Sequence, residues 1–234
     1  MLSKILYRTG ALTVDLCARL MFNRDIVRHA PLPEGAKIIS PNHPSTTDPF
    51  LILASFQEPV SILIDNRLFK VPLFGEYLRR TGHIPVVEGQ GYTAFEAARR
   101  LLEEGRTVVV FPEGTISPLA GGLHPPRTGA ARLALLTGAP IIPVGIYLER
   151  RRLRLIETRI DGKKEIGTWY LGGPFAVTFG QPMWFQGDVE NREYVASMSK
   201  RLMRRIAQLT FESAYRVIGM QALAALDSGE LVIL

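Results

Sequence analysis

Residues 37–53 read KIISPNHPSTTDPFLIL, and this stretch decides the fold. Residues 37–40 form an apolar, strand-like run. Ser45 or Thr46 can cap the helix that residues 50–53 predict. A strand that leads through a short loop into a helix is typical of a βα unit, the building block of α/β folds. We therefore expect an α/β fold that carries this loop at one edge of its sheet.

The loop contains a histidine and a carboxylate that can face each other. His43 lies at the exit of the expected strand, and Asp48 lies in the first turn of the expected helix. A histidine becomes a general base when a carboxylate fixes its tautomer and stabilises the imidazolium that forms. A His-x4-Asp pair also arises by chance, so on its own this one is more simply a loop histidine near a helix-start aspartate.

A second loop occupies the same kind of position. Residues 107–111 are a continuous run of mainly β-branched residues, which is typical of a strand buried on both faces, and Pro112-Glu113-Gly114-Thr115 follows it. Proline cannot continue a central strand and glycine permits a sharp turn, so Glu113 is expected to project from the carboxyl edge of the sheet. Open α/β sheets bind ligands at that edge, and two such loops favour a functional site.

With these loops the chain resembles the PlsC-like glycerolipid acyltransferases, which comprise lysophosphatidate and glycerol-3-phosphate acyltransferases. The resemblance rests on Asn42-His43-x4-Asp48 and on Phe111-Pro112-Glu113-Gly114-Thr115. Further similar blocks follow in the family's order, at residues 72–75 with 82–86, 127–134, 141–146 and 175–182. The resemblance covers roughly residues 37–182, and several ordered blocks are more specific than any single motif.

The resemblance implies an acyltransferase of phospholipid biosynthesis or remodelling. Such an enzyme moves a fatty acyl group from acyl-CoA or acyl carrier protein to a hydroxyl of a glycerolipid or lysolipid. His43 would take the hydroxyl proton and Asp48 would orient His43. Transfer is direct, so no cofactor and no nucleophilic serine or cysteine is implied. The residues expected to bind substrate are Glu113, Gly114, Thr115, Asn42 and Arg127.

Two positions depart from the family pattern. The family usually carries arginines, associated with the acceptor's phosphate, where this chain has Glu88 and Ile116. Arginine grips phosphate through a permanently charged, bidentate fork that neither residue can imitate. Two alternatives therefore stay open: a lipid acceptor without a phosphate, and a catalytically silent membrane-binding relative.

The N-terminal residues predict an amphipathic helix. Its apolar stripe consists of Leu2, Ile5, Leu6, Leu12, Leu16 and Leu20. Charges interrupt this run too often for a membrane-spanning helix, so residues 1–30 are predicted to form an interfacial, membrane-associating helical segment, in which residues 21–28 could extend the helix. Packing of the same stripe on the domain is an equally good interpretation. Residues 31–234 are assigned to the acyltransferase domain.

The rest of the chain alternates between strands and helices, which favours a central, largely parallel sheet flanked by helices. Strands are predicted at residues 60–65, 84–87, 107–111 and 141–147. One helix between them is opened by the capping box Thr93-x-x-Glu96, and another covers residues 127–137. Additional strands at 151–157, 168–171 and 175–180 surround a turn at 161–164, and a helix is expected over about 190–216.

Composition limits the other classes of function. The chain has 234 residues, 47% of them hydrophobic, enough for one sizeable core. Its net charge of +6 favours anionic partners. No nucleic-acid motif accompanies the charge, so an anionic membrane surface is the expected partner, at the cytoplasmic face and peripheral. The single cysteine, Cys17, suits a reducing compartment, and the four histidines lack the spacing of metal ligands.

Overall fold

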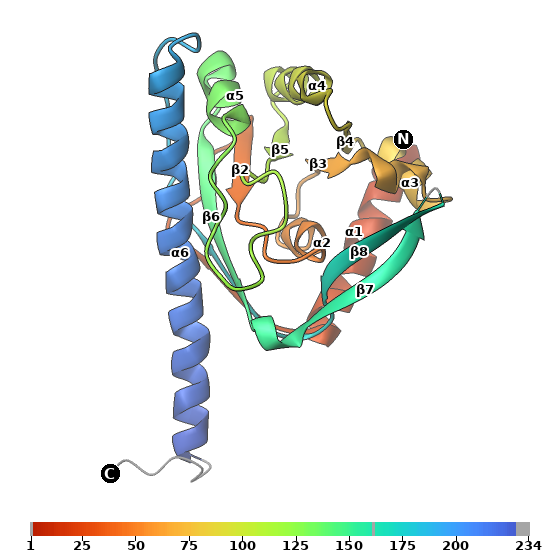
Figure 1. Cartoon of the computed structure of the whole chain (residues 1–234), viewed down its shortest axis with the longest axis vertical. Coiled ribbons are helices and arrows are strands. Elements are labelled where there is room, and N and C mark those ends of the chain that lie inside the picture. Colours follow the sequence, from red (N-terminus) through yellow and green to blue (C-terminus); the bar gives the residue numbers. More distant parts are fainter. Residues whose placement is uncertain (1, 161, 228–234) are drawn as a thin grey trace.

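The centre of the protein is a seven-stranded sheet in the order β1-β9-β6-β2-β5-β3-β4 (Figure 1). The computed structural model describes residues 2–160 and 162–227. The strands are β1 (Phe22–Arg28), β2 (Lys37–Pro41), β3 (Val60–Asp65), β4 (Ile84–Val86), β5 (Thr107–Val109), β6 (Ile141–Leu148) and β9 (Gly173–Phe179). Neighbouring strands are parallel except β6 and β9. The predicted α/β fold with a largely parallel sheet is confirmed.

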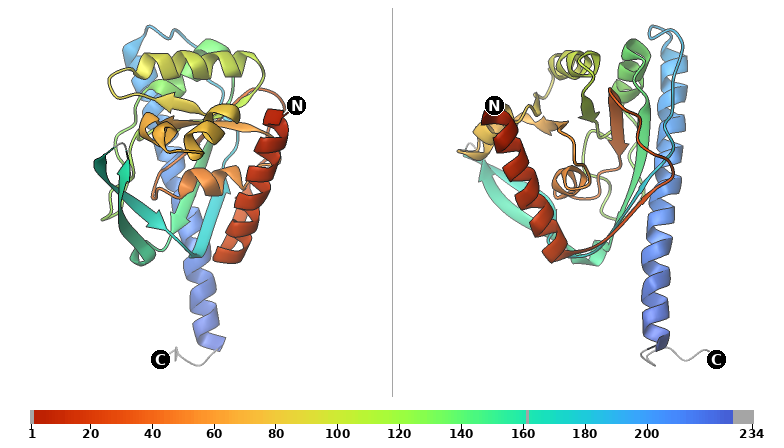
Figure 2. Two further views of the ribbon diagram at one scale, coloured as in Figure 1. Left: turned by 90° about the vertical axis from the view of Figure 1, so that its right-hand side faces the viewer. Right: turned by 180° about the vertical axis from the view of Figure 1, so that it is seen from behind.

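Helices cover both faces of this sheet (Figures 1 and 2). They are α1 (Leu2–Met21), α2 (Asp48–Leu53), α3 (Phe74–Arg80), α4 (Gly91–Glu103), α5 (Gly129–Thr137) and α6 (Arg192–Asp227), with short 3-10 helices η1 (Asn66–Lys70) and η2 (Arg150–Arg152). Helices α1 and α2 contribute to one hydrophobic core, and α4, α5 and α6 contribute to the other. In β2, Ile39 points into the first core and Ile38 into the second. Burial on both faces explains why the central strands read as unbroken apolar runs.

Two further strands form a separate hairpin that stands outside the main sheet (Figure 1). They are β7 (Leu153–Ile160) and β8 (Lys163–Tyr170), and they pair antiparallel. Both strands are longer than predicted. Asp161, in the turn that the sequence predicts between them, lies outside the described residues.

Several local predictions are wrong. Residues 22–28 do not extend the N-terminal helix but form β1, because they pair in register with β9 and so satisfy their backbone groups within the sheet. Helix α4 starts at Gly91 after the N-cap Gln90, ahead of the predicted capping box, and Glu96 binds Arg99 instead. The N-cap of α2 is Thr47 rather than Ser45 or Thr46. Helix α6 continues past the predicted end to Asp227, and α3 and η1 were not predicted. The assignment of residues 1–30 to an N-terminal segment and of residues 31–234 to the acyltransferase domain stays a prediction; β1 of the main sheet falls in the first of these ranges.

Helix α1 has one face on the protein core and one in solvent. Tyr7 and Ala18 belong to the core. Four residues of the apolar stripe do not: the exposed fractions are 51% for Ile5, 69% for Leu12, 58% for Leu16 and 78% for Leu20, whereas Leu6 is half-buried. Packing of the stripe on the domain is thus ruled out for these four residues, and the side chain of Leu2 lies outside the described residues. Of the helices in the described ranges, none combines the length and the apolar character needed to cross a bilayer.

Candidate active site

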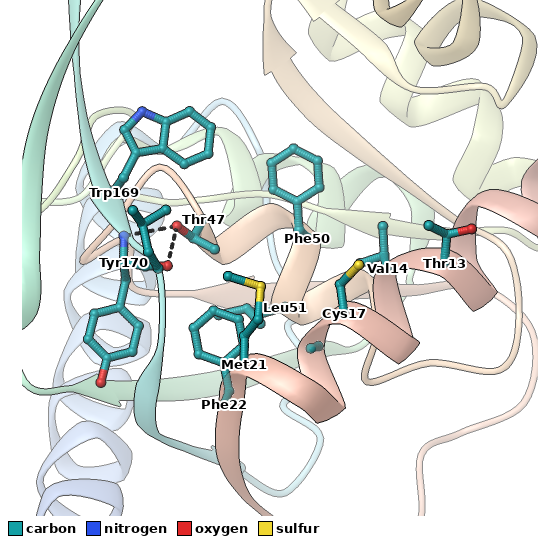
Figure 3. Close-up of a pocket in the computed structure, with 12 residues that line it drawn as sticks. Thr13, Val14, Cys17, Met21, Phe22, Thr47, Phe50, Leu51, Trp169 and Tyr170 are labelled. Atoms are coloured by element: carbon teal, nitrogen blue, oxygen red, sulfur yellow. Dashed lines mark hydrogen bonds between the residues drawn. The ribbon is translucent and has the colours of Figure 1, made fainter.

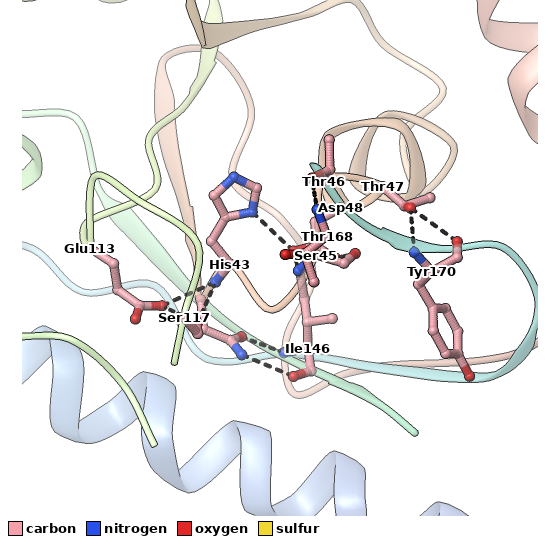
Figure 4. A network of polar contacts seen from close by, with 11 residues as sticks. His43, Ser45, Thr46, Thr47, Asp48, Glu113, Ser117, Ile146, Thr168 and Tyr170 are labelled. Carbon is pink, nitrogen blue, oxygen red and sulfur yellow. Dashed lines mark hydrogen bonds and ion pairs between the residues drawn. The ribbon is translucent and has the colours of Figure 1, made fainter. Parts of the chain in front are cut away.

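His43 and Asp48 meet at the carboxyl edge of the sheet. His43 follows β2 and Asp48 opens α2, so the connecting loop brings a strand exit and a helix start together. The imidazole Nδ1 lies 3.0 Å from Asp48 Oδ2 (Figure 4). Because an ionised carboxylate only accepts hydrogen bonds, Nδ1–H is the donor, which leaves the lone pair on Nε2. Figure 4 shows the ring directed away from the Glu113 side of the site.

Asp48 is fixed by the loop that precedes it. Its carboxylate is fully buried and accepts hydrogen bonds from Ser45 N at 2.7 Å and from Ser45 Oγ at 2.6 Å. A buried carboxylate needs such partners to offset the loss of hydration. These bonds hold Asp48 in position to orient His43.

The imidazole of His43 is held from its other side as well. It stacks on Phe111 with ring centroids 4.0 Å apart and an interplanar angle of 25°. The side chain keeps 16% of its surface exposed. His43 is therefore oriented by packing and by a hydrogen bond, yet it remains accessible to a substrate.

Glu113 organises the loop opposite His43. The carboxylate is 3% exposed and accepts hydrogen bonds from His43 N at 3.1 Å, Ser117 Oγ at 2.6 Å and His124 N at 2.7 Å. The loop is closed further by Ser117 N, which donates to His43 O at 2.7 Å. Glu113 thus joins the two loops that the sequence placed at this edge. Its assignment to substrate binding stays a prediction.

Asn42 links two strands at the start of the same loop. Its Nδ2 donates to Ile146 O at 3.0 Å, and its Oδ1 accepts from Ile146 N at 2.7 Å. The side chain is 2% exposed. Both polar ends are therefore engaged by β6, a geometry that favours positioning of the loop, while the predicted contact with substrate remains untested.

The loop is also bound to the β7–β8 hairpin, which sequence reasoning missed. Thr46 N donates to Thr168 O at 2.7 Å, and Thr168 N donates to Thr46 Oγ1 at 3.0 Å. Thr47 Oγ1 donates to Tyr170 O at 2.9 Å and accepts from Tyr170 N at 3.0 Å. No local signal in the sequence could reveal these contacts, because the partners lie more than a hundred residues apart.

The exposed rim of the site is formed by Gly114, Thr115 and Arg127. Gly114 has a φ of +68°, and a Cβ added there would lie 2.3 Å from Arg127 Nε. Glycine therefore serves both the backbone turn and the close approach of the guanidinium. Arg127 has no carboxylate partner within the described part of the chain. Glu88 is exposed and Ile116 is half-buried.

An apolar pocket of about 190 Å³ opens beside the loop (Figure 3). Thr47, Phe50 and Leu51 line its inner wall. The remaining walls come from α1, the first residue of β1, the end of β8 and the residue after it, through Thr13, Val14, Cys17, Ala18, Met21, Phe22, Trp169, Tyr170 and Leu171. Thr47 precedes Asp48 in the chain, but neither His43 nor Asp48 lines the pocket.

His83 differs chemically from His43. It is buried, and its Nδ1 accepts a hydrogen bond from Ile62 N at 3.2 Å. Burial, reinforced by the charge of Arg106, lowers the pKa of His83 to about 4. His83 is therefore neutral near pH 7 and is a structural residue of the core.

The chain belongs to the acyltransferase family: the family model described as Acyltransferase matches residues 23–147. It is similar to proteins described as 1-acyl-sn-glycerol-3-phosphate acyltransferase. The one from Borreliella burgdorferi is 33% identical over 113 residues, which cover 47% of this chain and 45% of that protein. The one from Haemophilus influenzae is 31% identical over 145 residues, which cover 58% of this chain and 59% of that protein. The one from Escherichia coli is 29% identical over 126 residues, covering 52% and 51%.

The chain spans about half the length of the curated relatives it matches. A solved structure, described as the 1-acyl-sn-glycerophosphate (LPA) acyltransferase PlsC from Thermotoga maritima, superimposes with a TM-score of 0.58 at 24% identity. The superposition covers 88% of this chain and 79% of that one, and it shows a shared fold. The resemblance to PlsC-like acyltransferases that the sequence predicted is confirmed.

Proposed function

We propose that this protein transfers a fatty acyl group from a thioester donor, acyl-CoA or acyl carrier protein, to the hydroxyl of a lysolipid acceptor. The observation that carries the proposal is the His43–Asp48 pair, in which Nε2 of His43 is left to act as the base. Membership of the acyltransferase family supports acyl transfer in general. The intact pair argues against a catalytically silent relative.

In the proposed reaction, His43 Nε2 takes the proton of the acceptor hydroxyl as its oxygen attacks the thioester carbonyl. Asp48 stabilises the imidazolium that forms. The tetrahedral intermediate collapses with cleavage of the carbon–sulfur bond, and His43 returns the proton to the departing thiolate. An ester and a free thiol result, and the histidine regains its initial state.

The pocket offers a place for an acyl chain. Its walls are almost wholly apolar, and hydrocarbon leaves water for such a surface with a gain of about 0.8 kcal/mol per buried methylene. The pocket begins at Thr47, so a chain lying in it would bring its carbonyl or glycerol end toward His43. We infer that it receives the acyl chain of either the donor or the acceptor.

The rim of the site suggests which acceptors fit. Arg127 offers a guanidinium beside Gly114, where the headgroup of a lysophospholipid would approach. Glu88 and Ile116 favour a second candidate, a lysolipid whose phosphate is masked or absent. Glu88 would repel a dianionic headgroup, and Ile116 offers no donor to it.

We further propose that the protein works peripherally at the cytoplasmic face of a membrane. The exposed stripe of α1, with Leu12, Leu16 and Leu20, would lie among lipid headgroups and acyl chains. Arg8 and Arg19 are exposed on the same helix and would face anionic lipid. In this proposal the N-terminal segment attaches the acyltransferase domain to the surface that holds its acceptor.

The test is to incubate purified protein with a lysolipid extract and radiolabelled acyl-CoA or acyl carrier protein, and to identify the labelled product. We expect a labelled diacyl lipid from the wild type and none from His43→Ala. Absence of labelled lipid with both donors would overturn the proposed function. A product formed equally well by His43→Ala would overturn the assignment of the base.

A further inference from the structure

The β7–β8 hairpin with its preceding turn is unusually rich in positive charge. Residues 149–170 carry seven lysines and arginines against four acidic residues, so the segment is cationic although it makes up a small part of the chain. Three of its exposed cations, Arg154, Arg159 and Lys163, pair with no carboxylate of the described residues. Unpaired surface cations of this kind attract an anionic surface.

The hairpin also exposes apolar side chains. Leu155 and Ile166 are each 63% exposed, and Leu171 at the base of the hairpin is 46% exposed. In the register of the hairpin, Leu155 pairs with Thr168, and Glu157 pairs with Ile166. Leu155 and Ile166 are therefore diagonal neighbours on one face of the hairpin. By the same register Arg159 lies on this face, whereas Arg154 and Lys163 lie on the other face. The hairpin therefore presents exposed apolar side chains together with cations on both of its faces, as a segment that meets a bilayer does.

The hairpin and α1 lie on the same side of the molecule. All views in Figures 1 and 2 show them as two arms that approach each other at one end. The apolar pocket is lined from both arms, by Cys17 and Met21 of α1 and by Trp169 and Leu171 of the hairpin. A bilayer touching both arms would therefore cover the mouth of the pocket.

We propose that the β7–β8 hairpin is a second membrane-contacting element, which binds an anionic lipid bilayer together with α1. The inference rests on the proposed function, because a lipid acceptor gives the protein a reason to sit on a bilayer. The hairpin holds Thr46 and Thr47 through four hydrogen bonds, so contact with the bilayer places the loop of His43 and Asp48 at the lipid surface. The exposed Leu155 and Ile166 favour lipid over an acidic protein such as acyl carrier protein.

The first experiment removes the three unpaired cations, in the variant Arg154→Gln, Arg159→Gln and Lys163→Gln. Binding is measured by co-sedimentation with vesicles of phosphatidylcholine mixed with phosphatidylglycerol. We expect affinity to fall by about fivefold for each cation that meets the surface, and the loss to shrink on pure phosphatidylcholine and at high salt.

The matched control removes the same charge elsewhere, in the variant Lys200→Gln, Arg201→Gln and Arg204→Gln. These exposed residues lie on α6, across the molecule from α1 (Figure 1). We expect the control to bind vesicles nearly as the wild type does. An equal loss in both variants would mean that net charge alone drives binding, and it would overturn the assignment to the hairpin.

A second measurement reports contact directly. In a Cys17→Ser background, Ile166→Cys is labelled with a polarity-sensitive fluorophore, and Phe211→Cys on α6 serves as the control. We expect a blue shift on vesicles for the label at position 166 and none at position 211. A label at position 166 that stays in water while the protein is vesicle-bound would overturn the proposal.

Measuring turnover with a detergent-dispersed acceptor tests the proposed enzymatic function without requiring a bilayer. Its result is therefore independent of whether the hairpin contacts a membrane. If the hairpin variant binds vesicles normally and the wild type transfers acyl groups, the hairpin is not a membrane contact, but the proposed enzymatic function stands. Normal vesicle binding combined with weakened use of acyl carrier protein would identify the hairpin as a protein-docking surface instead. If the wild type binds vesicles through the hairpin but transfers no acyl group, only the proposed enzymatic function is overturned.

Discussion

Thr47 and Tyr170 are joined by two hydrogen bonds, although 123 residues separate them in the chain. The hydroxyl of Thr47 takes the place of a backbone partner for both the N–H and the C=O of Tyr170. Thr46 pairs with Thr168 in a similar way. The segment between His43 and Asp48 is thereby fastened to a hairpin that lies outside the main sheet.

These hydrogen bonds predict that Thr47 positions the loop that carries His43 and Asp48. Thr47→Val keeps the shape of the side chain but leaves two buried backbone groups of Tyr170 unpaired, at a cost of about 1–3 kcal/mol each. We expect a lower melting temperature and a lower kcat with little change in KM, because valine keeps the volume of the side chain that lines the pocket while the loop loses its anchor. Thr47→Ser, which restores the hydroxyl, should recover both. A Thr47→Val variant with unchanged kcat would show that the hairpin does not position the loop.

The pair itself is tested by His43→Ala and Asp48→Asn. His43→Ala should abolish acyl transfer while the circular dichroism spectrum stays unchanged, because the side chain lies at a loop edge. Asp48→Asn should lose most activity, because the imidazolium loses its counter-charge; general-base effects are typically ~10²- to 10⁴-fold. Near-normal turnover by either variant would contradict the assignment.

Attachment through α1 is tested by Leu12→Gln, Leu16→Gln and Leu20→Gln. Deleting the helix would be a poorer test, because Tyr7 and Ala18 belong to the core. We expect weaker co-sedimentation with vesicles and lower activity on bilayer-held acceptor, with activity on detergent-dispersed acceptor preserved. Unchanged sedimentation would show that α1 does not touch the bilayer.

Acceptor choice is tested by combining Glu88→Arg with Ile116→Arg. Two guanidinium groups would replace an anion and an apolar side chain at the positions where the family usually carries arginines, so we expect kcat/KM for lysophosphatidate to rise relative to lysolipids with masked or absent phosphates. The wild type should show weak selectivity between these acceptors. If the wild type strongly prefers lysophosphatidate and Arg127→Ala loses that preference, Arg127 binds the phosphate. The weak selectivity inferred from Glu88 and Ile116 would then be wrong.

His83 predicts a pH dependence of folding. Its pKa is about 4 in the folded chain and about 6.5 for an unperturbed histidine, so between these values the unfolded chain binds a proton that the folded chain does not. The contribution of His83 is therefore complete above pH 6.5 and is lost as the pH falls toward 4, by up to about 3 kcal/mol. The NMR titration of the His83 imidazole, compared with denaturation curves across this range, checks both values. A normal pKa for His83 would remove the effect.

The local sequence determined much of the sheet and the identity of the pair. The strands around Ile38, Val108 and Ile142 were predictable because burial on both faces requires continuous apolar runs. His43 and Asp48 could be paired because they lie within one short loop. The exposure of one face of α1 was left open, since periodicity reveals that a helix has an apolar stripe but not what covers it.

Only the tertiary structure decided the features that depend on long-range contacts. Residues 22–28 became β1 because β9 offers a parallel edge, and this outweighs the helical pattern before them. Glu113 and Asn42 are engaged by partners from distant parts of the chain. The hairpin reaches the His43 loop through Thr46 and Thr47 for the same reason. Backbone hydrogen bonds to remote partners carry no signature in local sequence, whereas hydrophobic burial does, so the core could be predicted and the support of the site could not.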